Sequence, residues 1–339
     1  MKTKHGLLLA VMVTSGIYAT VARAQGSVQD AIKGSVSDAN TLVNGYVSPA
    51  LTAIGYGLNQ GWYNTAKPHK VLGIDVTATI NFMKIPTSAA TYYIDNSKLN
   101  TIERLTGPGG NPQSGNVPTI FGSNIAPSYG YKPNGTPGFS GAPGTDLSGV
   151  PVIQNSLPIP MAQLGLGLPK GFELKFRYVP TINFGNNQGS NFNLFGVGLM
   201  HDVKRYIPGI KLLPFDLSGF VGYTKMTLNA AFDSNHPDQI GTLSSSATTI
   251  QGVISKKLAV LTAYAGLGYN FAKTKISVTG NYDLGNGTYV PVQLGASANS
   301  TGPRMTAGLR LKLAIFTFHG EYTLQKYSAL TLGFGLSIR

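Results

Sequence analysis

The sequence has no cysteine and few charged residues, and both absences narrow the choice of protein class. Without cysteine, the chain has no disulfide bonds and no thiolate metal sites. Charged residues make up 12% of the chain, whereas soluble proteins have about a quarter. After residue 24, no uninterrupted apolar run approaches the roughly 18 residues that a membrane-spanning helix needs. A disulfide-stabilised domain and a helical membrane protein are therefore excluded, and an ordinary soluble domain fits the composition poorly.

The distribution of charge excludes a further class of protein. The formal net charge is +13, but the lysines and arginines are scattered, and no dense basic run is present. Because nucleic-acid binding needs a concentrated basic surface, we expect no nucleic-acid partner. A dispersed cationic excess suits contact with anionic lipid head groups or anions inside a pore.

The first 24 residues have the parts of a cleavable signal peptide. Lys2 and Lys4 give a basic start, residues 7–22 are largely apolar, and Ala22 and Ala24 are the small residues that a signal peptidase requires. We expect cleavage before Gln25 and export to the outer membrane. Because no cysteine follows the segment, a lipoprotein anchor is excluded.

From residue 70 to residue 339 the hydrophobic pattern has a period of two. Between Leu72 and Phe82, apolar residues alternate with Gly, Asp, Thr and Asn, as in a strand with one face toward lipid and the other toward a wet interior. Similar runs flank Pro169-Lys170-Gly171 and fill residues 305–338. The pattern predicts an all-β fold, an antiparallel transmembrane β-barrel of about 10 strands within a range of 8–14. A soluble β-sandwich also alternates, but its exposed polar face would carry more charge.

The lengths of the connections predict which end of the barrel is outside. Pro169-Lys170-Gly171 is a tight turn, and outer-membrane barrels keep their short turns in the periplasm. Residues 87–156, which lack periodicity, then form a long extracellular loop. Its part from Gly107 to Gly149 is rich in Gly, Pro, Asn and Ser, and we expect it to be mobile and uncovered. The dipeptide Asn286-Gly287 predicts a hairpin that we place in another outer loop.

Residues 25–69 form a short N-terminal segment with helical rather than strand spacing. Asp38 is placed to cap a first helix, and Ser48-Pro49 to begin a second one. Helices this short need a surface to lie on, and we expect them to plug the barrel lumen. In the alternative they only brace its mouth. The residues that we expect to form the plug are Leu42, Tyr46, Leu51, Ile54, Leu58 and Trp62.

The alternation also assigns the two faces of each strand. In the last strand Leu332 and Phe334 face lipid, whereas Thr331 and Gly333 face the lumen. The charged and titratable residues that the same rule directs into the lumen are Asp75, Glu173, Lys175, Arg177, Arg310, Lys312, His319 and Glu321. Gly165 and Gly167 are also inward, where they let a plug pack closely against the wall.

Candidate chemistry in the sequence is fragmentary. His319 and Glu321 lie two apart on one inward face, but the repeat of this spacing at Glu173 and Lys175 favours a ladder of charges over an acid–base pair. His201-Asp202 lacks a third metal ligand at a suitable spacing. We therefore expect no enzyme activity, no metal and no cofactor.

Three blocks of sequence carry a resemblance to a known family: residues 60–70, 201–225 and 310–339. Together they resemble a family of Gram-negative, Bacteroidetes-type outer-membrane β-barrel proteins that carry a domain of unknown function. More distantly, the helical N-terminus and residues 198–203 are similar to the long-chain fatty-acid channel superfamily. Those channels have more strands and usually end on an aromatic residue, whereas the last ring here is Phe334. The resemblance implies a barrel, and it carries over no functional residues.

Two functions fit these expectations. The barrel is a selective channel for a small hydrophobic or amphiphilic solute, with its helices as a plug. Alternatively, it is a non-transporting structural, adhesion or secretion-associated subunit that binds a protein partner through the 87–156 loop. In both cases we expect outer-membrane lipid and lipopolysaccharide as neighbours.

Overall fold

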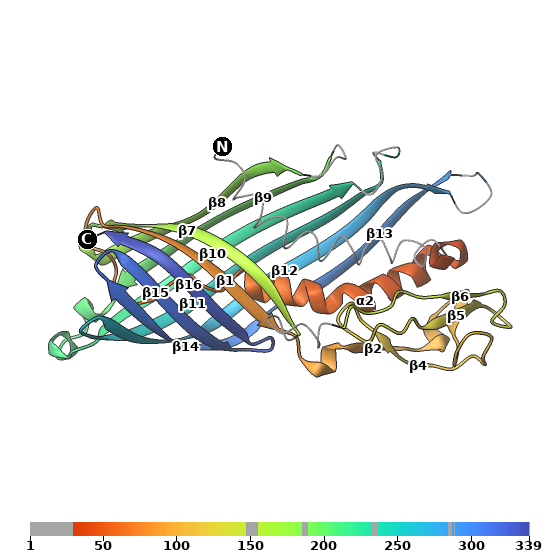
Figure 1. The fold of residues 1–339 in the computed structure, drawn as a ribbon, viewed down its shortest axis with the longest axis horizontal. Coiled ribbons are helices and arrows are strands. Elements are labelled where there is room, and N and C mark those ends of the chain that lie inside the picture. The colour runs from red at the N-terminus through yellow and green to blue at the C-terminus, as the bar shows by residue number, and fades with distance from the viewer. Residues whose placement is uncertain are drawn as a thin grey trace.

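The computed structural model describes residues 30–146, 155–184, 189–231, 236, 238–283, 287 and 289–338. The expected signal peptide at 1–24 and the final Arg339 lie outside the described residues. Within them, the main feature is a closed ring of antiparallel strands, which lies on its side in Figure 1.

The ring is closed because each of its strands pairs with the next one along the chain, and the last pairs with the first. Its ten strands are β1 (Ile74–Lys84), β7 (Ser156–Leu168), β8 (Phe172–Asn183), β9 (Asn191–Asp202), β10 (Asp216–Ala231), β11 (Ile240–Leu258), β12 (Leu261–Asp283), β14 (Gly302–Leu313), β15 (Phe316–Leu324) and β16 (Ala329–Ile338). The predicted all-β fold with an antiparallel barrel of about ten strands is confirmed.

The two ends of the ring differ in their connections. Residues 169–171, 259–260 and 314–315 make tight turns at one end, which we call the lower end. The connection that leaves β1 at residue 85 and returns to β7 at residue 155 begins and ends at the other end, which we call the upper end. β1 begins and β16 finishes at the lower end (Figure 1).

One wall of the ring is taller than the rest, because β12 continues far beyond its pairing with β14, and β11 and β10 remain paired beside it up to Ile240 and Ala231. β13 (Tyr289–Asn299) pairs with β12 from Lys273 to Asp283, and β14 pairs with β12 from Leu261 to Asn270. β13 and β14 therefore follow one another along the same edge of β12. The two strands that flank the hairpin expected around Asn286-Gly287, β12 and β13, pair with each other, and Asn286 itself lies outside the described residues.

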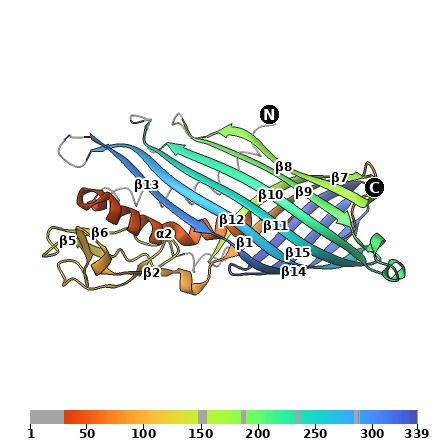
Figure 2. The same cartoon turned by 180° about the vertical axis from the view of Figure 1, so that it is seen from behind.

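The helix α2 (Val36–Gly57) lies along the inner face of the tall wall, as Figures 1 and 2 show from opposite sides. The prediction of two short helices is wrong, because Pro49 lies inside a single helix and Ser35 rather than Asp38 caps it. The helix continues because Leu51 and Ile54 stay on its apolar face and pack into the largest core of the protein. That packing outweighs the backbone hydrogen bond that a proline removes.

The insertion between β1 and β7 is a small folded unit on the other side of α2 (Figure 1). Its strands are β2 (Thr91–Ile94), β3 (Ile102–Arg104), β4 (Gly115–Pro118), β5 (Ser128–Tyr131) and β6 (Gly138–Ser140), and two single-turn helices span Thr87–Ala89 and Asn96–Lys98. The stretch from Gly107 to Asp146 is exposed in part, with Ile125 at 73%, but the expectation that all of it is uncovered is wrong at Val117 and Tyr129, which are each only 2% exposed. Their apolar side chains fold the chain locally despite its turn-rich composition.

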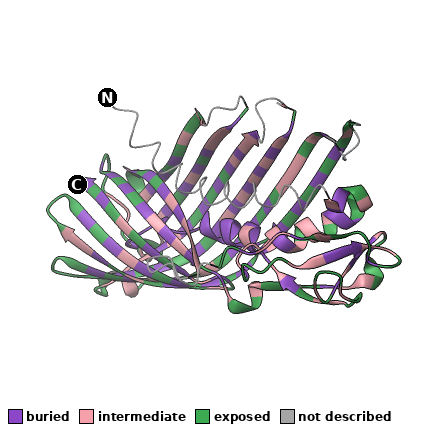
Figure 3. Ribbon diagram, turned by 45° about the vertical axis from the view of Figure 1, so that its right-hand side comes forward, coloured by how far each residue is buried: buried purple, intermediate pink, exposed green. Residues whose placement is uncertain are grey.

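The ring strands change the polarity of their two faces part-way along their length. On β12, the outward residues from Leu261 to Phe271 are apolar and the inward ones include Thr262 and Asn270. Above Phe271 the outward residues are Lys273, Lys275 and Ser277, while Ala272 and Ile276 point inward against the core. Figure 3 shows the underlying alternation of buried and exposed residues along the strands.

The same change occurs at the same height on other strands. Outward residues change from Tyr223 to Lys225 on β10, and inward residues change from Asn81 to Met83 on β1. The lower zone thus has an apolar outside and a polar inside, as a membrane-spanning barrel requires. The upper zone has the opposite arrangement and packs on α2 like a soluble domain. Among the described residues, no helix is both long and apolar enough to cross a membrane.

Near the upper end of β8, side chains face the opposite way from the alternation. The alternation predicts that Phe184 continues the lipid-facing row of Phe172 to Tyr178, but the register shifts between Val179 and Ile182. Val179 and Phe184 pack inward against the core instead. The bulge lies at the level where the inside of the ring becomes apolar, so it moves these side chains to the face that buries them.

We predict that Leu267→Arg destabilises the barrel far more than Ser277→Arg. Both residues face outward on β12, but Leu267, which is 65% exposed, lies in the middle of the apolar belt and Ser277 lies above it. An arginine at the midplane costs about 2–4 kcal/mol, and near zero outside the membrane. Equilibrium unfolding in liposomes measures both. Equal losses of stability would show that the belt is not in contact with lipid.

Candidate functional site in the barrel lumen

The chain that follows α2 passes down through the lumen. α2 has its C-cap at Leu58, and residues 58–70, which we call the lumen segment, connect it to the lower end where β1 begins. Every residue from 51 to 66 is buried. The interior of the lower zone is therefore occupied by this protein's own backbone and side chains.

Two arginines from opposite walls hold the top of the lumen segment. Arg177 on β8 donates to the carbonyl oxygens of Leu58, at 2.8 Å, and of Gln60, at 2.6 Å. Arg304 on β14 donates to the carbonyl oxygen of Asn59, at 2.7 Å, and to Oε1 of Gln60, at 3.0 Å. The last carbonyl groups of α2 accept from the backbone that follows the helix: Asn59 N–H donates to Tyr56 and Gln60 N–H to Gly57. The two guanidinium groups supply donors to the next three carbonyl groups, those of residues 58–60, which are buried inside the ring.

An aromatic layer lies directly below the two arginines. The Arg177 guanidinium stacks 3.6 Å above the Trp62 ring, an arrangement that favours a cation over an indole face. Trp62 and Tyr63 both contact Phe220 of β10, with ring centroids 5.6 and 5.7 Å apart. Tyr63 also contacts Tyr264 of β12 and donates a hydrogen bond to Gln251.

Inward glycines make room for this layer. A Cβ atom on Gly198 would lie 3.0 Å from the Trp62 ring, and one on Gly222 would lie 2.8 Å from it. Such contacts are too short for an unshifted neighbour. The indole therefore needs glycine at both positions, and the wall and the lumen segment are complementary in shape.

One carboxylate balances the two arginines. Glu321 of β15 is 3% exposed, accepts a hydrogen bond from the Tyr264 hydroxyl at 3.0 Å and receives the backbone N–H of Gly61. It also interacts with the charges of Arg177 and Arg304 without forming a direct ion pair. The carboxylate therefore binds the lumen segment from the same layer as the arginines.

A second polar cluster surrounds the lower end of the lumen segment. The Glu173 carboxylate contacts Lys175 Nζ at 2.5 Å and His69 Nδ1 at 3.2 Å. His69 Nε2 lies 3.0 Å from the Ser337 hydroxyl, which also accepts from Lys312. This cluster fixes the chain just before β1, and Gly167 lies against the backbone of residues 69 and 70.

Several groups beside that cluster lack a hydrogen-bond partner within the described part of the chain. They are Nε and Nη2 of Arg310, Nδ1 of His319, Oδ2 of Asp75 and the hydroxyl of Thr317. Buried polar atoms of this kind need water or a polar ligand. The layer around Arg177 also contains such atoms, at Oδ1 of Asn59, Nε1 of Trp62 and Nε of Arg304.

The structure places all eight residues that the sequence directs into the lumen on the inner face of the ring. Seven are buried, and Lys312 is half-buried. Of the six plug residues, Leu58 and Trp62 lie in the lumen, Leu51 and Ile54 pack in the core above it, and Leu42 and Tyr46 contact the insertion. His319 and Glu321 have different surroundings, since one has an unpartnered nitrogen and the other is bound by Tyr264.

The sequence did not identify three residues of the layer around Arg177, namely Arg304, Gln60 and Gln163. Gln163 Oε1 accepts from Arg177 at 3.2 Å, and its amide donates to the Trp62 carbonyl at 3.1 Å. Arg304 is in phase with Thr306 and Arg310 on β14, so the two-residue period was a sufficient signal for it. Gln60 had no such signal, because the lumen segment has no regular period.

Asp38 joins α2 to the insertion. It is 1% exposed, and its carboxylate accepts backbone N–H groups from Asn100 and Thr101, both at 2.8 Å, and from Ile102 at 3.3 Å. Asp38 is therefore an anchor for a loop 62 residues away and not the helix cap that its position suggests. Burial alone would raise the pKa of this carboxyl group, but the hydrogen bonds outweigh burial and hold the pKa below its ordinary value.

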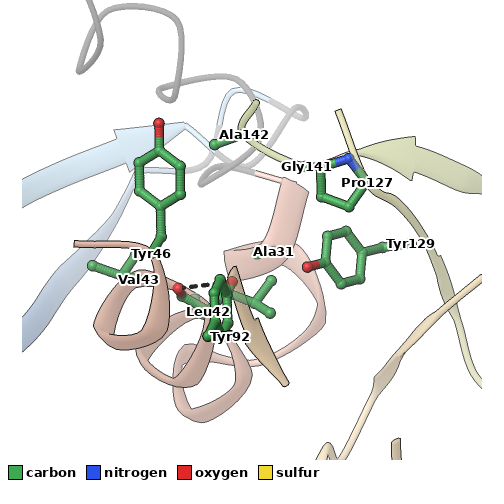
Figure 4. Close-up of a pocket in the computed structure, with 10 residues that line it drawn as sticks. Ala31, Leu42, Val43, Tyr46, Tyr92, Pro127, Tyr129, Gly141 and Ala142 are labelled. Atoms are coloured by element: carbon green, nitrogen blue, oxygen red, sulfur yellow. Dashed lines mark hydrogen bonds between the residues drawn. The ribbon is translucent and has the colours of Figure 1, made fainter. Parts of the chain in front are cut away.

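A small apolar pocket lies between α2 and the insertion (Figure 4). Its volume is about 40 Å³, and Leu42, Tyr46, Tyr92 and Tyr129 are among the residues that line it. Tyr92 donates to the Leu42 carbonyl at 3.2 Å, as the dashed line in Figure 4 shows. The volume is far below that of pockets for drug-sized ligands, so this contact is a packed junction between helix and insertion.

The alignment of the chain with a known family model extends over residues 1–338. The chain belongs to a family of unknown function, DUF6588. The likeness that the sequence blocks indicate to a family with a domain of unknown function is thus confirmed. No curated protein matches the chain.

Solved outer-membrane barrels show limited likeness. The translocator domain of the autotransporter NalP from Neisseria meningitidis is 10% identical, with 86% of this chain and 93% of that chain covered and a TM-score of 0.27. The attachment invasion locus protein Ail of Yersinia pestis is 13% identical, with 49% and 93% covered and a TM-score of 0.25. The toluene transporter TodX of Pseudomonas putida is 9% identical, with 79% and 68% covered and a TM-score of 0.27. Because these scores are low, the barrel rests on its own strand pairing, and the resemblance to fatty-acid channels stays a prediction.

We predict that Arg177→Ala lowers the free energy of unfolding by about 2–5 kcal/mol, because it removes the guanidinium donor from the buried Gln60 carbonyl and leaves the Leu58 carbonyl only the long hydrogen bond from Thr224, at 3.4 Å. Guanidinium chloride unfolding in detergent micelles measures the loss. Lys326→Ala, an exposed change in the β15–β16 turn, is the control. If the two variants were equally stable, the arginine would not hold the lumen segment.

We predict that docking of the insertion on α2 weakens only in strong acid. A carboxylate whose folded pKa is depressed stabilises the folded state above its unfolded pKa, and this contribution is lost as the pH falls through the folded value. The window therefore lies below the ordinary Asp value of 3.8. Hydrogen-exchange protection of the amides from Asn100 to Ile102 should fall there. Asp38→Asn should lower protection at neutral pH and flatten the profile; an unchanged profile would contradict the role of Asp38.

Proposed function

We propose that this protein is an outer-membrane barrel that its own lumen segment keeps closed, and that it anchors a folded outer unit at the cell surface. The outer unit consists of α2, the insertion of residues 85–146 and the tall wall of β11–β13. One observation carries the proposal. Arg177 and Arg304, from opposite walls, donate hydrogen bonds to the carbonyl groups of residues 58–60.

Orientation follows from the rule that barrels keep short turns in the periplasm. The lower end, with its tight turns, then faces the periplasm, and the outer unit is extracellular. Export through the expected signal peptide at 1–24 agrees with this location. Above the apolar belt the walls no longer contact lipid, so the outer unit is a water-exposed domain built on the same strands.

A closed lumen suits an anchor better than a conduit. The lumen segment is buried along its length from Leu58 to Ala66, and opening it would strip partners from the buried charges of Arg177, Arg304 and Glu321. Leaving such charges unpaired is costly. The outer unit, in contrast, exposes Tyr93 and Ile125, at 64% and 73%, on the insertion. We therefore propose that a protein partner binds the insertion, and we propose no catalytic role for the lumen residues.

A selective channel for a small hydrophobic or amphiphilic solute is the second candidate. Two observations favour it: the aromatic layer of Trp62, Tyr63 and Phe220 on the axis, and the unpartnered groups of Arg310 and His319 below it. In this case the lumen segment must move during each passage. The two functions therefore make different demands on the lumen segment: a channel requires it to move, and an anchor requires it to stay bound in the lumen.

A disulfide lock separates the two functions. The hydroxyl oxygens of Thr65 in the lumen segment and Ser255 on β11 lie 3.3 Å apart, so the sulfur atoms of Thr65→Cys and Ser255→Cys need to move little to reach the bonding distance of about 2.05 Å. The native chain has no cysteine, so only this bond forms. We predict that wild-type, oxidised and reduced proteins all show negligible conductance in planar bilayers and negligible release of small amphiphilic dyes from proteoliposomes.

Deletion of residues 38–60 is the positive control, since it removes the groups that both arginines bind and should produce conductance. Passage of dye through the reduced double variant that stops on oxidation would overturn the proposal and establish a gated channel. A silent deletion variant would show that residues 38–60 do not close the lumen.

A further inference from the structure

A row of lysines follows the upper edge of the apolar belt on the outer face of the barrel. The strand registers align Lys225 of β10 with Ser246 of β11, and Ser246 with Lys273 of β12. Adjacent strands lie about 4.8 Å apart, so the two lysines are about 10 Å apart in one row across the strands. Lys275 is in the next row up, level with Ser244 and Thr227.

In the row directly below, the residues on β10 and β12, on either side of β11, are aromatic. The registers align Tyr223 with Thr248, and Thr248 with Phe271. Aromatic residues mark the interface between hydrocarbon and water on barrels. The lysines therefore sit at the height of the lipid head groups, with the belt beneath them.

A groove of about 780 Å³ opens at this height between the tall wall and α2. Lys273 and Lys275 line it together with hydroxyl and amide side chains, which include Ser244, Ser297 and Asn40. No acidic side chain is among its lining residues. In the described part of the chain, the three lysines form no ion pair or hydrogen bond with other protein groups and all are exposed.

This combination of groups fits a ligand that is both phosphorylated and rich in hydroxyl groups. Ammonium groups bind phosphate, and serine, threonine and asparagine side chains bind sugar hydroxyls. Because the groove begins at the head-group level, a membrane lipid reaches it without leaving the bilayer. We propose that the Lys225–Lys273–Lys275 face and its groove bind the phosphorylated sugar head group of the outer leaflet's glycolipid.

The test measures binding of fluorescent diphosphorylated lipid A to the purified full mature protein in uncharged detergent micelles. The triple variant Lys225→Ser, Lys273→Ser and Lys275→Ser should bind about tenfold more weakly or worse, and raised salt should weaken the wild type. The control variant Lys256→Ser and Lys257→Ser removes two exposed lysines at the lower end, and its affinity should stay within about twofold of the wild type. Circular dichroism and heat-dependent gel mobility verify that each variant is folded.

Removal of the lipid A phosphates should reproduce the loss seen in the triple variant. Soluble glucose 1-phosphate should compete only weakly, because it lacks the acyl chains that place the head group at the groove. A triple variant that is folded and binds lipid A with wild-type affinity would overturn the proposal. Equal loss in the control variant would overturn it too, since binding would then follow total charge. If glucose 1-phosphate bound as tightly as lipid A, the site would serve a free phosphosugar and the lipid assignment would fail.

Discussion

The need to satisfy buried backbone carbonyl groups inside a barrel shapes this protein. The chain leaves α2 within the ring, where the carbonyl groups of residues 58–60 are buried, and Arg177 and Arg304 supply their donors. Those cations in turn need the Trp62 face and the Glu321 carboxylate. This layer also explains the residue types around it, because each of them contacts one of its members: the inward glycines of β9 and β10, Gln163 and Tyr264.

A second constraint comes from the reversal of polarity along the strands. In the lower zone the outside is apolar and the inside polar, so the lumen segment is bound by hydrogen bonds and charges. In the upper zone the inside is apolar, so α2 is bound by the hydrophobic effect. One continuous chain, from α2 to His69, therefore uses two kinds of interaction in turn. The insertion completes the upper zone through Asp38, which binds it to α2 by hydrogen bonds to backbone N–H groups.

The sequence predicts the ring and most of its inward residues because a strand's side chains alternate with a strict period of two. That rule placed Asp75, Arg177 and Glu321 correctly on the inner face, and it was sufficient to find Arg304. It gave the wrong face for Phe184, because a bulge between Val179 and Ile182 shifts the register. A bulge depends on which face buries a side chain best, and the local sequence does not encode that choice.

Composition and periodicity alone determined the class of fold, an approximate number of strands and the helical character of the N-terminal segment, since these depend on local geometry and average polarity. Only the tertiary structure decided that α2 continues through Pro49, that Asp38 binds the insertion, and that Leu58 to Gln60 meet arginines from opposite walls. Each of these contacts joins residues far apart in the sequence, and Arg177 lies 119 residues from Leu58. Their energies come from burial and from pairing of buried polar groups, and both depend on neighbours that only the closed ring brings together.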